Sequence, residues 1–379
     1  MANNNKHTGP NVPALRFPEF SGEWERKALS EFVDRVTRRN KGLKSTRPLT
    51  ISAQFGLVDQ TEFFKKSVAG ADLSNYYLLS KGEFAYNKSY SDGYPLGAIK
   101  RLDRYDSGVL SSLYICFVPK PYMSSDYLVQ YFESTKWNQV VKDISGEGAR
   151  NHGLLNVPVT GFFETQHYIP KRDEQEKLGA FLTLIEKRIA TQSKIIEEQE
   201  TLLKSLADKL ISAQSANVAI CGCVDAKAST MKEGELESHG AFPVFGASGL
   251  CGYSNEALEE SDSILVTKDG SGVGTCQYAT GAHSFLGTLC SLTAKKGVYL
   301  PYVYYALLNF NFASFKTGLA IPHIYFKDYG KAVIYCPSYD EQVRIASGIE
   351  KIEAKIKSDK ELLKQYQLQK EYLLSRMFI

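Results

Sequence analysis

The sequence predicts an α+β fold in which two globular domains are separated by a long antiparallel two-helix coiled coil, with a pseudo-twofold internal repeat. Two observations predict it. The pattern Tyr-x-Pro-x-x-Asp-Glu-Gln occurs twice, as YIPKRDEQ at 168–175 and as YCPSYDEQ at 335–342. Each copy opens a stretch with heptad spacing and follows a block rich in aromatic residues, β-branched residues and glycine. The expected parts are a tail at 1–16, a globular block at 17–167, a helix at 168–212, a second block at 213–334 and a second helix at 335–379.

The chain begins with a polar stretch, MANNNKHTGPNV, which we expect to be disordered. No apolar run approaches the roughly 18 residues that a membrane span needs, and no secretory signal is recognisable. The seven cysteines are odd in number and irregular in spacing. These features predict a reduced, cytoplasmic protein without contact to a membrane. Neither the cysteines nor the six histidines have the spacing of a metal site, so no metal is expected.

The net charge of +3 does not by itself indicate a nucleic-acid partner. The basic residues are unevenly distributed, however, and one dense cluster, RVTRRNKGLKSTR, lies at 35–47. It contains Arg38, Arg39, Lys41 and Lys44. Two interpretations are open, a solvated basic loop and a loop that contacts phosphates.

Within the two blocks, similar elements are expected in the same order. SLYICFVPKP at 112–121 and SILVTKDG at 263–270 are typical of strands that end in turns. Residues 126–141 and 301–315 are predicted to be helices. Each block then leads into its copy of the repeated pattern, so the chain is a tandem of block, helix, block, helix.

The repeated pattern predicts helix starts. Proline ends the preceding strand, Asp173 or Asp340 is expected to cap the helix, and the following glutamate lies in the first turn. Asp173 and Glu176 also fit a capping box, which the second copy lacks. Aligned 167 residues apart, the copies continue without a gap to residues 212 and 379.

Beyond these starts, apolar residues alternate at spacings of four and three in both copies. Such a seam needs a partner helix, and the other copy is the expected partner; the alternative is two unrelated amphipathic helices on separate cores. Polar residues interrupt the seam at matching places, Gln192 and Asp359. The predicted seam contains Leu182, Ile185, Ile189, Ile196, Leu203, Ile349, Ile352, Ile356, Leu363 and Leu373.

This organisation resembles the specificity subunit of type I restriction–modification systems over nearly the whole chain. Matching phrases are LRFPEFSGEWERKALSEF at 15–32, GEFAYNKSYSDGYPLGAIK at 82–100, SGVLSSLYICF at 107–117 and LLSRMFI at the end. Block two departs from the pattern, because CGCVDAKA stands where an entry phrase like that around Trp24 is expected. The start of the second block is therefore open.

The resemblance implies a function. Each block is then a target recognition domain that reads one half of a split, asymmetric double-stranded DNA site. The helical pair spaces the halves and docks two methyltransferase subunits, which bind S-adenosylmethionine and methylate adenine. Restriction subunits add ATP- and Mg-dependent translocation and cleavage. The chain itself holds no cofactor and has no catalytic residues.

The resemblance also suggests which residues contact DNA. In block one these lie in AYNKSYSDGYPLGAIKR at 85–101, and in block two the glycine-rich stretch SILVTKDGSGVGT at 263–275 is the counterpart. Asparagine suits adenine, and lysine suits guanine or phosphate. With the basic cluster, the predicted contacts are Arg38, Arg39, Lys41, Lys44, Asn87, Lys88, Tyr90, Ser91, Lys100, Arg101, Lys268, Asp269, Ser271, Thr275, Lys316 and His323.

Other interpretations remain at this level. The glycine-rich stretch could be a nucleotide-binding loop of a self-contained enzyme, although it lacks G-x-G-x-x-G spacing, or a glycine turn without a functional role. The chain could also be a coiled-coil scaffold whose β-rich blocks bind carbohydrate or protein. Steep salt dependence of DNA binding would distinguish a DNA-binding protein from such a scaffold.

Overall fold

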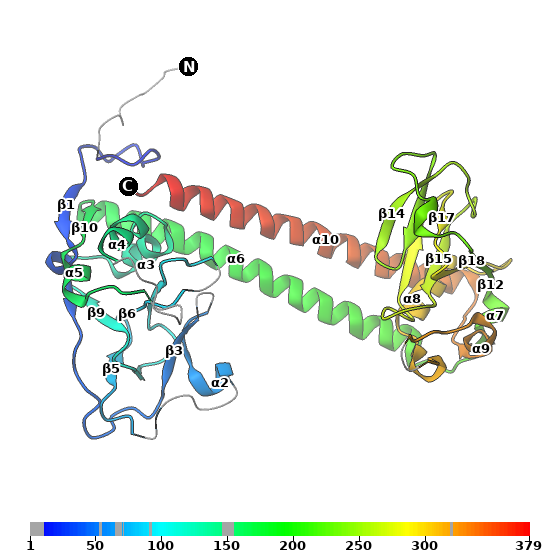
Figure 1. Cartoon of the computed structure of the whole chain (residues 1–379), viewed down its shortest axis with the longest axis horizontal. Coiled ribbons are helices and arrows are strands. Elements are labelled where there is room, and N and C mark those ends of the chain that lie inside the picture. The colour runs from blue at the N-terminus through cyan, green and yellow to red at the C-terminus, as the bar shows by residue number, and fades with distance from the viewer. Residues whose placement is uncertain are drawn as a thin grey trace, which may run out of the picture. The chain divides into compact units, whose positions relative to one another are not determined.

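The computed structural model describes residues 11–52, 55–64, 70, 72–90, 93–145, 155–318 and 321–379. It is a mixed α/β structure with two compact units (Figure 1). Unit 1 comprises Met1–Gln192 and Leu362–Ile379, and unit 2 comprises Ser193–Glu361. Each unit therefore has one globular part and a portion of each long helix.

Unit 1 is built around a four-stranded antiparallel sheet in the order β2-β9-β6-β7. Its core joins this sheet to the helices beside it through Phe84, Phe117 and Phe132. The strands are β1 Glu25–Ala28, β2 Val33–Arg35, β3 Leu49–Ser52, β4 Gly56–Asp59, β5 Tyr77–Ser80, β6 Phe84–Asn87, β7 Ala98–Arg101, β8 Ser107–Leu110, β9 Ile115–Pro119 and β10 Gln166–Ile169. The short helices are α1 Leu29–Phe32, α2 Gln60–Phe64, α3 Ser125–Glu133, α4 Asn138–Ile144 and α5 Val159–Glu164.

Unit 2 contains a sheet of the same kind, in the order β12-β18-β15-β16, and a three-stranded sheet, β14-β13-β17. The strands are β11 Val218–Ala219, β12 Val224–Ala228, β13 Phe242–Gly246, β14 Gly249–Ser254, β15 Ser263–Thr267, β16 Cys276–Ala279, β17 Ser284–Phe285, β18 Leu289–Ala294 and β19 Val333–Ile334. The short helices are α7 Ile220–Cys223, α8 Leu300–Leu308 and α9 Phe326–Tyr329, with 3₁₀ turns at Glu233–Glu235 and Phe312–Phe315.

The globular parts of the two units begin with the same series of elements. In unit 1, β1 pairs with β10 and leads through α1 into β2; in unit 2, β11 pairs with β19 and leads through α7 into β12. The phrase CGCVDAKA thus occupies α7 and β12, which are equivalent to α1 and β2 and therefore follow the position of Trp24 rather than contain it. By this alignment, Ser215 takes the place of Trp24.

The predicted strands at 112–121 and 263–270 are present as β9 and β15. The prediction of a single helix at 126–141 is wrong, because this stretch forms two helices, α3 and α4. The break follows Ser134, whose hydroxyl donates to the carbonyl of Tyr131, and it lets Trp137 bury its ring and donate to the carbonyl of Phe132. Likewise, α8 ends at Leu308, and Asn311 caps the separate turn that begins at Phe312.

The long helices are α6, Arg172–Ala207, which continues as a π turn at Asp208–Ser212, and α10, Tyr339–Arg376 (Figure 1). Both begin one residue before the predicted caps, so Asp173 and Asp340 lie inside the first turn, where the helix dipole still favours negative charge. The predicted capping box is also wrong, because Glu176 pairs with Arg172, 2.7 Å away.

Within each unit, the portions of α6 and α10 run antiparallel. In unit 1, Glu186 accepts from Lys370 at 2.6 Å and Arg188 lies over the ring of Tyr366. In unit 2, Gln199 donates to Asp359 at 2.9 Å. The residues of the predicted seam are all buried or half-buried. Asp359, only 4 % exposed, also accepts from Lys355.

The glutamine of the repeated pattern makes the same contacts in both units. The side chain of Gln175 donates to the carbonyl of Pro170 and accepts from the backbone N–H of Ser124, at 2.8 and 2.9 Å. Gln342 donates to the carbonyl of Pro337 and accepts from the N–H of Tyr299, at 2.9 and 2.8 Å. We call these contacts the glutamine clamp; they fix the start of each long helix to the start of α3 or α8.

Candidate nucleic-acid interface

Both stretches predicted to contact DNA form the same hairpin of equivalent sheets. Residues 88–97 connect β6 to β7, and residues 268–275 connect β15 to β16. In each sheet, the hairpin joins the edge strand to its neighbour, and a helix that follows the β9 or β18 strand packs beside it. The counterpart relation inferred from sequence therefore corresponds to one structural position present twice.

The hairpin of unit 1 is closed by a close backbone approach. Gly97 has a φ of +79°, and a Cβ there would lie 2.1 Å from the carbonyl oxygen of Asn87. Asn87, half-buried at the end of β6, accepts from the N–H of Ser89 at 3.0 Å. Lys88 is half-buried, Tyr90 is 65 % exposed, and Ser91 lies outside the described residues. The hairpin thus carries an exposed aromatic residue, Tyr90, three positions after the half-buried Asn87.

Lys100 and Arg101 on β7 are engaged by carboxylates of the same unit. Lys100 pairs with Glu133 of α3 at 2.5 Å, and its side chain is only 10 % exposed. Arg101 pairs with Asp103 and Asp126, both at 2.7 Å. Because these ion pairs neutralise both cations, they leave less of the positive charge for a phosphate.

In the basic cluster, the arginines are held and the lysines are exposed. Arg38 pairs with Glu83 at 2.5 Å, and Arg39 lies 4.5 Å from the centre of the Tyr77 ring and donates to the carbonyl of Asn75. Lys41 and Lys44 are exposed and make no ion pair within the described part of the chain.

The loop that carries these lysines has a fixed shape. Fully buried Asn40 donates to the carbonyl of Ser45 at 2.8 Å and accepts from its N–H at 3.1 Å. Since this amide folds the loop back on itself, Lys41 and Lys44 are presented on a constrained turn.

The glycine-rich stretch of unit 2 is a turn between strands. Hydrogen bonds from Gly274 to Thr267 and from Thr275 to Gly272 close it, and the hydroxyls of Thr267 and Thr275 lie 2.8 Å apart. A strand follows the glycines, whereas a nucleotide-binding loop needs a helix there. Gly274 has a φ of +89°, and a Cβ there would lie 2.8 Å from Cβ of Phe312.

This turn is joined to the loop that contains His323. Gly270 donates to the carbonyl of Pro322 at 3.0 Å, and Ile324 donates to the carbonyl of Lys268 at 2.9 Å. His323 in turn exchanges backbone hydrogen bonds with Thr317. The structure therefore brings Lys268, Asp269, Ser271, Thr275, Lys316 and His323 together on one surface of unit 2.

The polarity of this surface is mixed. Ser271, Thr275 and Lys316 are exposed, while Lys268 pairs with Asp269 at 3.4 Å. Sequence reasoning missed two neighbours, Ile321 at 67 % exposure and Tyr325 at 45 %. Tyr325 packs its ring on His323 and under Lys327. The aromatic residues next to His323 in IPHIYF were the available signal.

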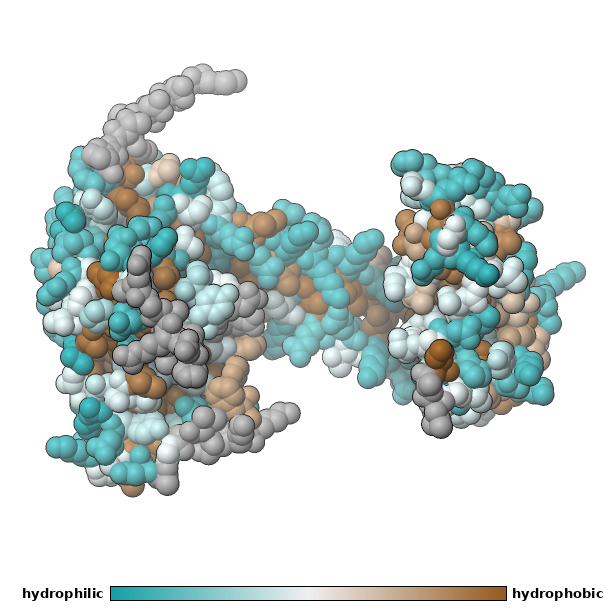
Figure 2. Space-filling model, viewed as in Figure 1, coloured by the Kyte–Doolittle hydropathy of each residue, from teal (hydrophilic) through white to brown (hydrophobic). Residues whose placement is uncertain are grey.

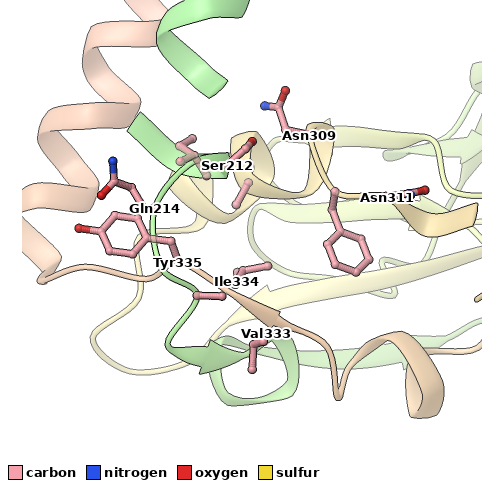
Figure 3. Close-up of a pocket in the computed structure, with 11 residues that line it drawn as sticks. Ser212, Gln214, Asn309, Asn311, Val333, Ile334 and Tyr335 are labelled. Atoms are coloured by element: carbon pink, nitrogen blue, oxygen red, sulfur yellow. The ribbon is translucent and has the colours of Figure 1, made fainter. Parts of the chain in front are cut away.

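A hollow of about 260 Å³ in the same unit lies between the end of α6, the end of α8 and β19 (Figure 3). Ser212, Gln214, Asn309 and Asn311 supply its polar groups, and no charged residue lines it. It has no cation for a phosphate, so we do not place it in the interface.

Other kinds of site receive no support from the described residues. They contain no cluster of three His, Cys, Asp or Glu side chains suited to a metal. All seven cysteines are free, and Cys223 is buried in the core. Over the same residues, no helix is long and apolar enough to cross a membrane.

Comparisons with known proteins point in one direction. Residues 220–367 match the model of the type I restriction modification DNA specificity domain. The type I restriction-modification S subunit of M. genitalium has a similar structure, with a TM-score of 0.60, 16 % identity and coverage of 97 % of this chain and 99 % of that one.

A second solved chain comes from work on complex assembly and conformational transition of the type I R-M system. It has a TM-score of 0.57, 15 % identity and coverage of 94 % and 97 %. No curated protein sequence matches. The resemblance found in the sequence is thus confirmed: residues 220–367 belong to the type I restriction–modification DNA specificity family, and the chain has the fold of its S subunits.

Proposed function

We propose that this chain is the DNA specificity subunit of a type I restriction–modification complex. Each globular part reads one half of a bipartite, asymmetric double-stranded DNA site. The helical pair spaces the two halves and docks two methyltransferase subunits, and restriction subunits join the full complex. The observation that most supports this proposal is that both units have the same hairpin on equivalent sheets.

The charges support contact with DNA at specific places. In unit 1, the exposed lysines of the basic cluster suit phosphates, and the amide of Asn87 with the ring of Tyr90 suits base edges. In unit 2, Lys268, Lys316 and His323 lie beside exposed hydroxyls. Among the described residues of the two hairpins, none forms a constellation that would perform chemistry, so we assign the chain a role in recognition.

Apolar residues on the long helices support docking of protein partners. Leu184, Ile195 and Leu202 of α6 are exposed by 64, 38 and 53 %. In unit 2, Ile195 and Leu202 are seven residues apart, which places them on one face of a helix that turns about 100° per residue. Figure 2 shows brown apolar patches along the helical stretch. An exposed apolar stripe of this kind is typical of an interface.

In this assembly, the cofactors belong to the partners. The methyltransferase subunits bind S-adenosylmethionine and methylate adenine, and the restriction subunits use ATP and Mg²⁺. The isolated chain is accordingly not an enzyme.

The test is methylome sequencing of cells that express the chain with a type I methyltransferase partner. The proposal expects adenine methylation at one bipartite site, and none without this chain. If the purified complex instead bound DNA with no dependence on salt or sequence, a scaffold with β-rich domains for other ligands would be the better interpretation.

A further inference from the structure

The N-terminal segment of unit 1, residues 15–24, lies on the long helices. Leu15 donates its N–H to the carbonyl of Arg376 at 2.9 Å. The ring of Phe17 packs edge-on against Phe181, with centroids 5.5 Å apart, and Lys177 lies 4.7 Å from its centre. The segment therefore covers the apolar groove between α6 and α10 in this unit.

Two ion pairs hold this segment. Arg16 pairs with Glu174 at 2.7 Å, and the two side chains are only 4 % and 3 % exposed. Glu19, three residues after Arg16, pairs with Lys177. Helix α6 thus offers the carboxylate of Glu174 to the cation of the segment and the ammonium group of Lys177 to its anion.

Unit 2 has the same groove, and none of the residues that the structure describes forms a covering segment of this kind over it. The repeat aligns Glu174 with Glu341, Lys177 with Arg344 and Phe181 with Gly348. The groove has a volume of about 250 Å³ and is lined by Leu206, Leu210, Arg344, Ile345, Gly348, Ile349 and Ile352. A Cβ on Gly348 would meet no atom within 4 Å.

The side chains beside the unit 2 groove carry the same charges as their counterparts in unit 1: Glu341 is acidic like Glu174, and Arg344 is basic like Lys177. Glu341 and Arg344 pair with each other at 2.5 Å, and their side chains are 36 % and 75 % exposed. Their counterparts in unit 1 instead pair with the covering segment. An exposed pair of this kind contributes little stability, so an occupant can replace it at small cost.

We propose that the unit 2 groove docks an extended segment of a partner protein. In this segment, an aromatic residue directly follows a basic residue, and an acidic residue stands three positions after the basic residue. The basic residue pairs with Glu341, the acidic residue with Arg344, and the ring fills the space above Gly348. A second copy of this chain is not the occupant. Its own segment is already held in unit 1 by the Arg16–Glu174 ion pair and by the packing of Phe17 on Phe181, and its release would break both.

The test uses the full chain and a fluorescently labelled peptide of residues 13–25, PALRFPEFSGEWE, as the probe. Anisotropy should show saturable binding, and Gly348→Trp should weaken it at least tenfold by filling the groove. Phe17→Ala in the peptide should have the same effect. Because position 348 is exposed and free of neighbours, Gly348→Trp should leave the melting temperature of the chain unchanged.

Charge exchange is the sharper control. A peptide with Arg16→Glu and Glu19→Arg should bind the wild-type chain at least tenfold more weakly, and binding should recover on a chain with Glu341→Arg and Arg344→Glu. Absence of peptide binding, or binding that survives Gly348→Trp, would overturn the proposal. So would a dimer of the chain that Gly348→Trp dissociates, because the occupant would then be a second copy. None of these measurements involves DNA.

Discussion

At the scale of single residues, the glutamine clamp joins each globular part to a long helix. Gln175 and Gln342 are each 2 % exposed, and each satisfies one backbone N–H and one carbonyl, which are buried in unit 1 and partly buried in unit 2. Replacement by leucine leaves both backbone groups without a partner, and each such group costs about 1–3 kcal/mol. We expect Gln175→Leu and Gln342→Leu each to lower the free energy of unfolding by about 2–4 kcal/mol.

Urea denaturation measures this effect. The matched control is Gln369→Leu on the exposed side of α10, where the same substitution should change stability by less than about 0.5 kcal/mol. Equal effects at positions 175 and 369 would show that the clamp is not a structural link.

His167 makes unit 1 sensitive to acid. Its ring nitrogens lie 2.7 Å from the hydroxyls of Tyr131 and Thr165, and burial lowers the pKa of His167 to about 4. The pKa in the folded state is thus below the unfolded value of about 6.5, so the unfolded state binds more protons between these pH values. The contribution is complete above pH 6.5 and is lost as the pH falls, by about 2 kcal/mol at pH 5.

Unfolding midpoints from pH 7.5 to 5 will measure the loss. The corresponding position in unit 2 is Ile334, so that unit has no matching histidine at this place. A His167→Gln variant should lose about 2 kcal/mol less than the wild type over this range, although it starts from a lower stability. Parallel pH curves for the two proteins would contradict this assignment.

At the scale of elements, the turn between β15 and β16 depends on one glycine. Gly274 combines a positive φ with the close approach to Phe312, so Gly274→Ala adds both backbone strain and a clash. Gly281 has a φ of +69° and nothing within 4 Å of its Cβ position, so Gly281→Ala adds strain alone. We expect Gly274→Ala to destabilise the chain by about 1–3 kcal/mol more than Gly281→Ala in thermal melts. Similar losses would mean that the contact with Phe312 does not constrain the turn.

The long helices could be predicted because their signal is periodic and repeated. Their exact starts could not, since the clamp places Lys171 and Ser338 before the first turn through contacts with Ser124 and Tyr299, which are distant in sequence. The break between α3 and α4 was missed for a similar reason, because burial of Trp137 overrides a continuous helical pattern.

The candidate site was predictable only in part. Local order and duplication were enough to equate the two hairpins. The sequence did not indicate that Arg38, Lys100 and Arg101 would be paired, because their partners are distant in sequence: Glu83 precedes β6, and Glu133 and Asp126 lie in α3. Which basic residues retain free charge depends on the tertiary structure. Contact of the named residues with DNA remains a prediction.

At the scale of the whole molecule, the proposed function predicts that the length of the helical pair sets the number of base pairs between the two half-sites. A heptad inserted in each helix, after Gln192 and after Gln365, keeps the seam in phase and lengthens each helix by about 10 Å. At about 3.4 Å per base pair, the spacer in the recognised site should grow by roughly three base pairs. Methylome sequencing would show this change, and an unchanged spacer with methylation retained would mean that another part of the complex sets the distance.

The central claim is that the two units read different halves of one DNA site. The most direct measurement is methylome sequencing of cells in which the methyltransferase partner is expressed with hairpin variants. Asn87→Ala and Lys88→Ala in unit 1 should relax one half-site, and Lys268→Ala and Ser271→Ala in unit 2 the other, by about 1–3 kcal/mol for each lost base contact. If variants in both hairpins relaxed the same half, or if neither set changed the methylated sequence, the claim that each unit reads one half-site would be contradicted.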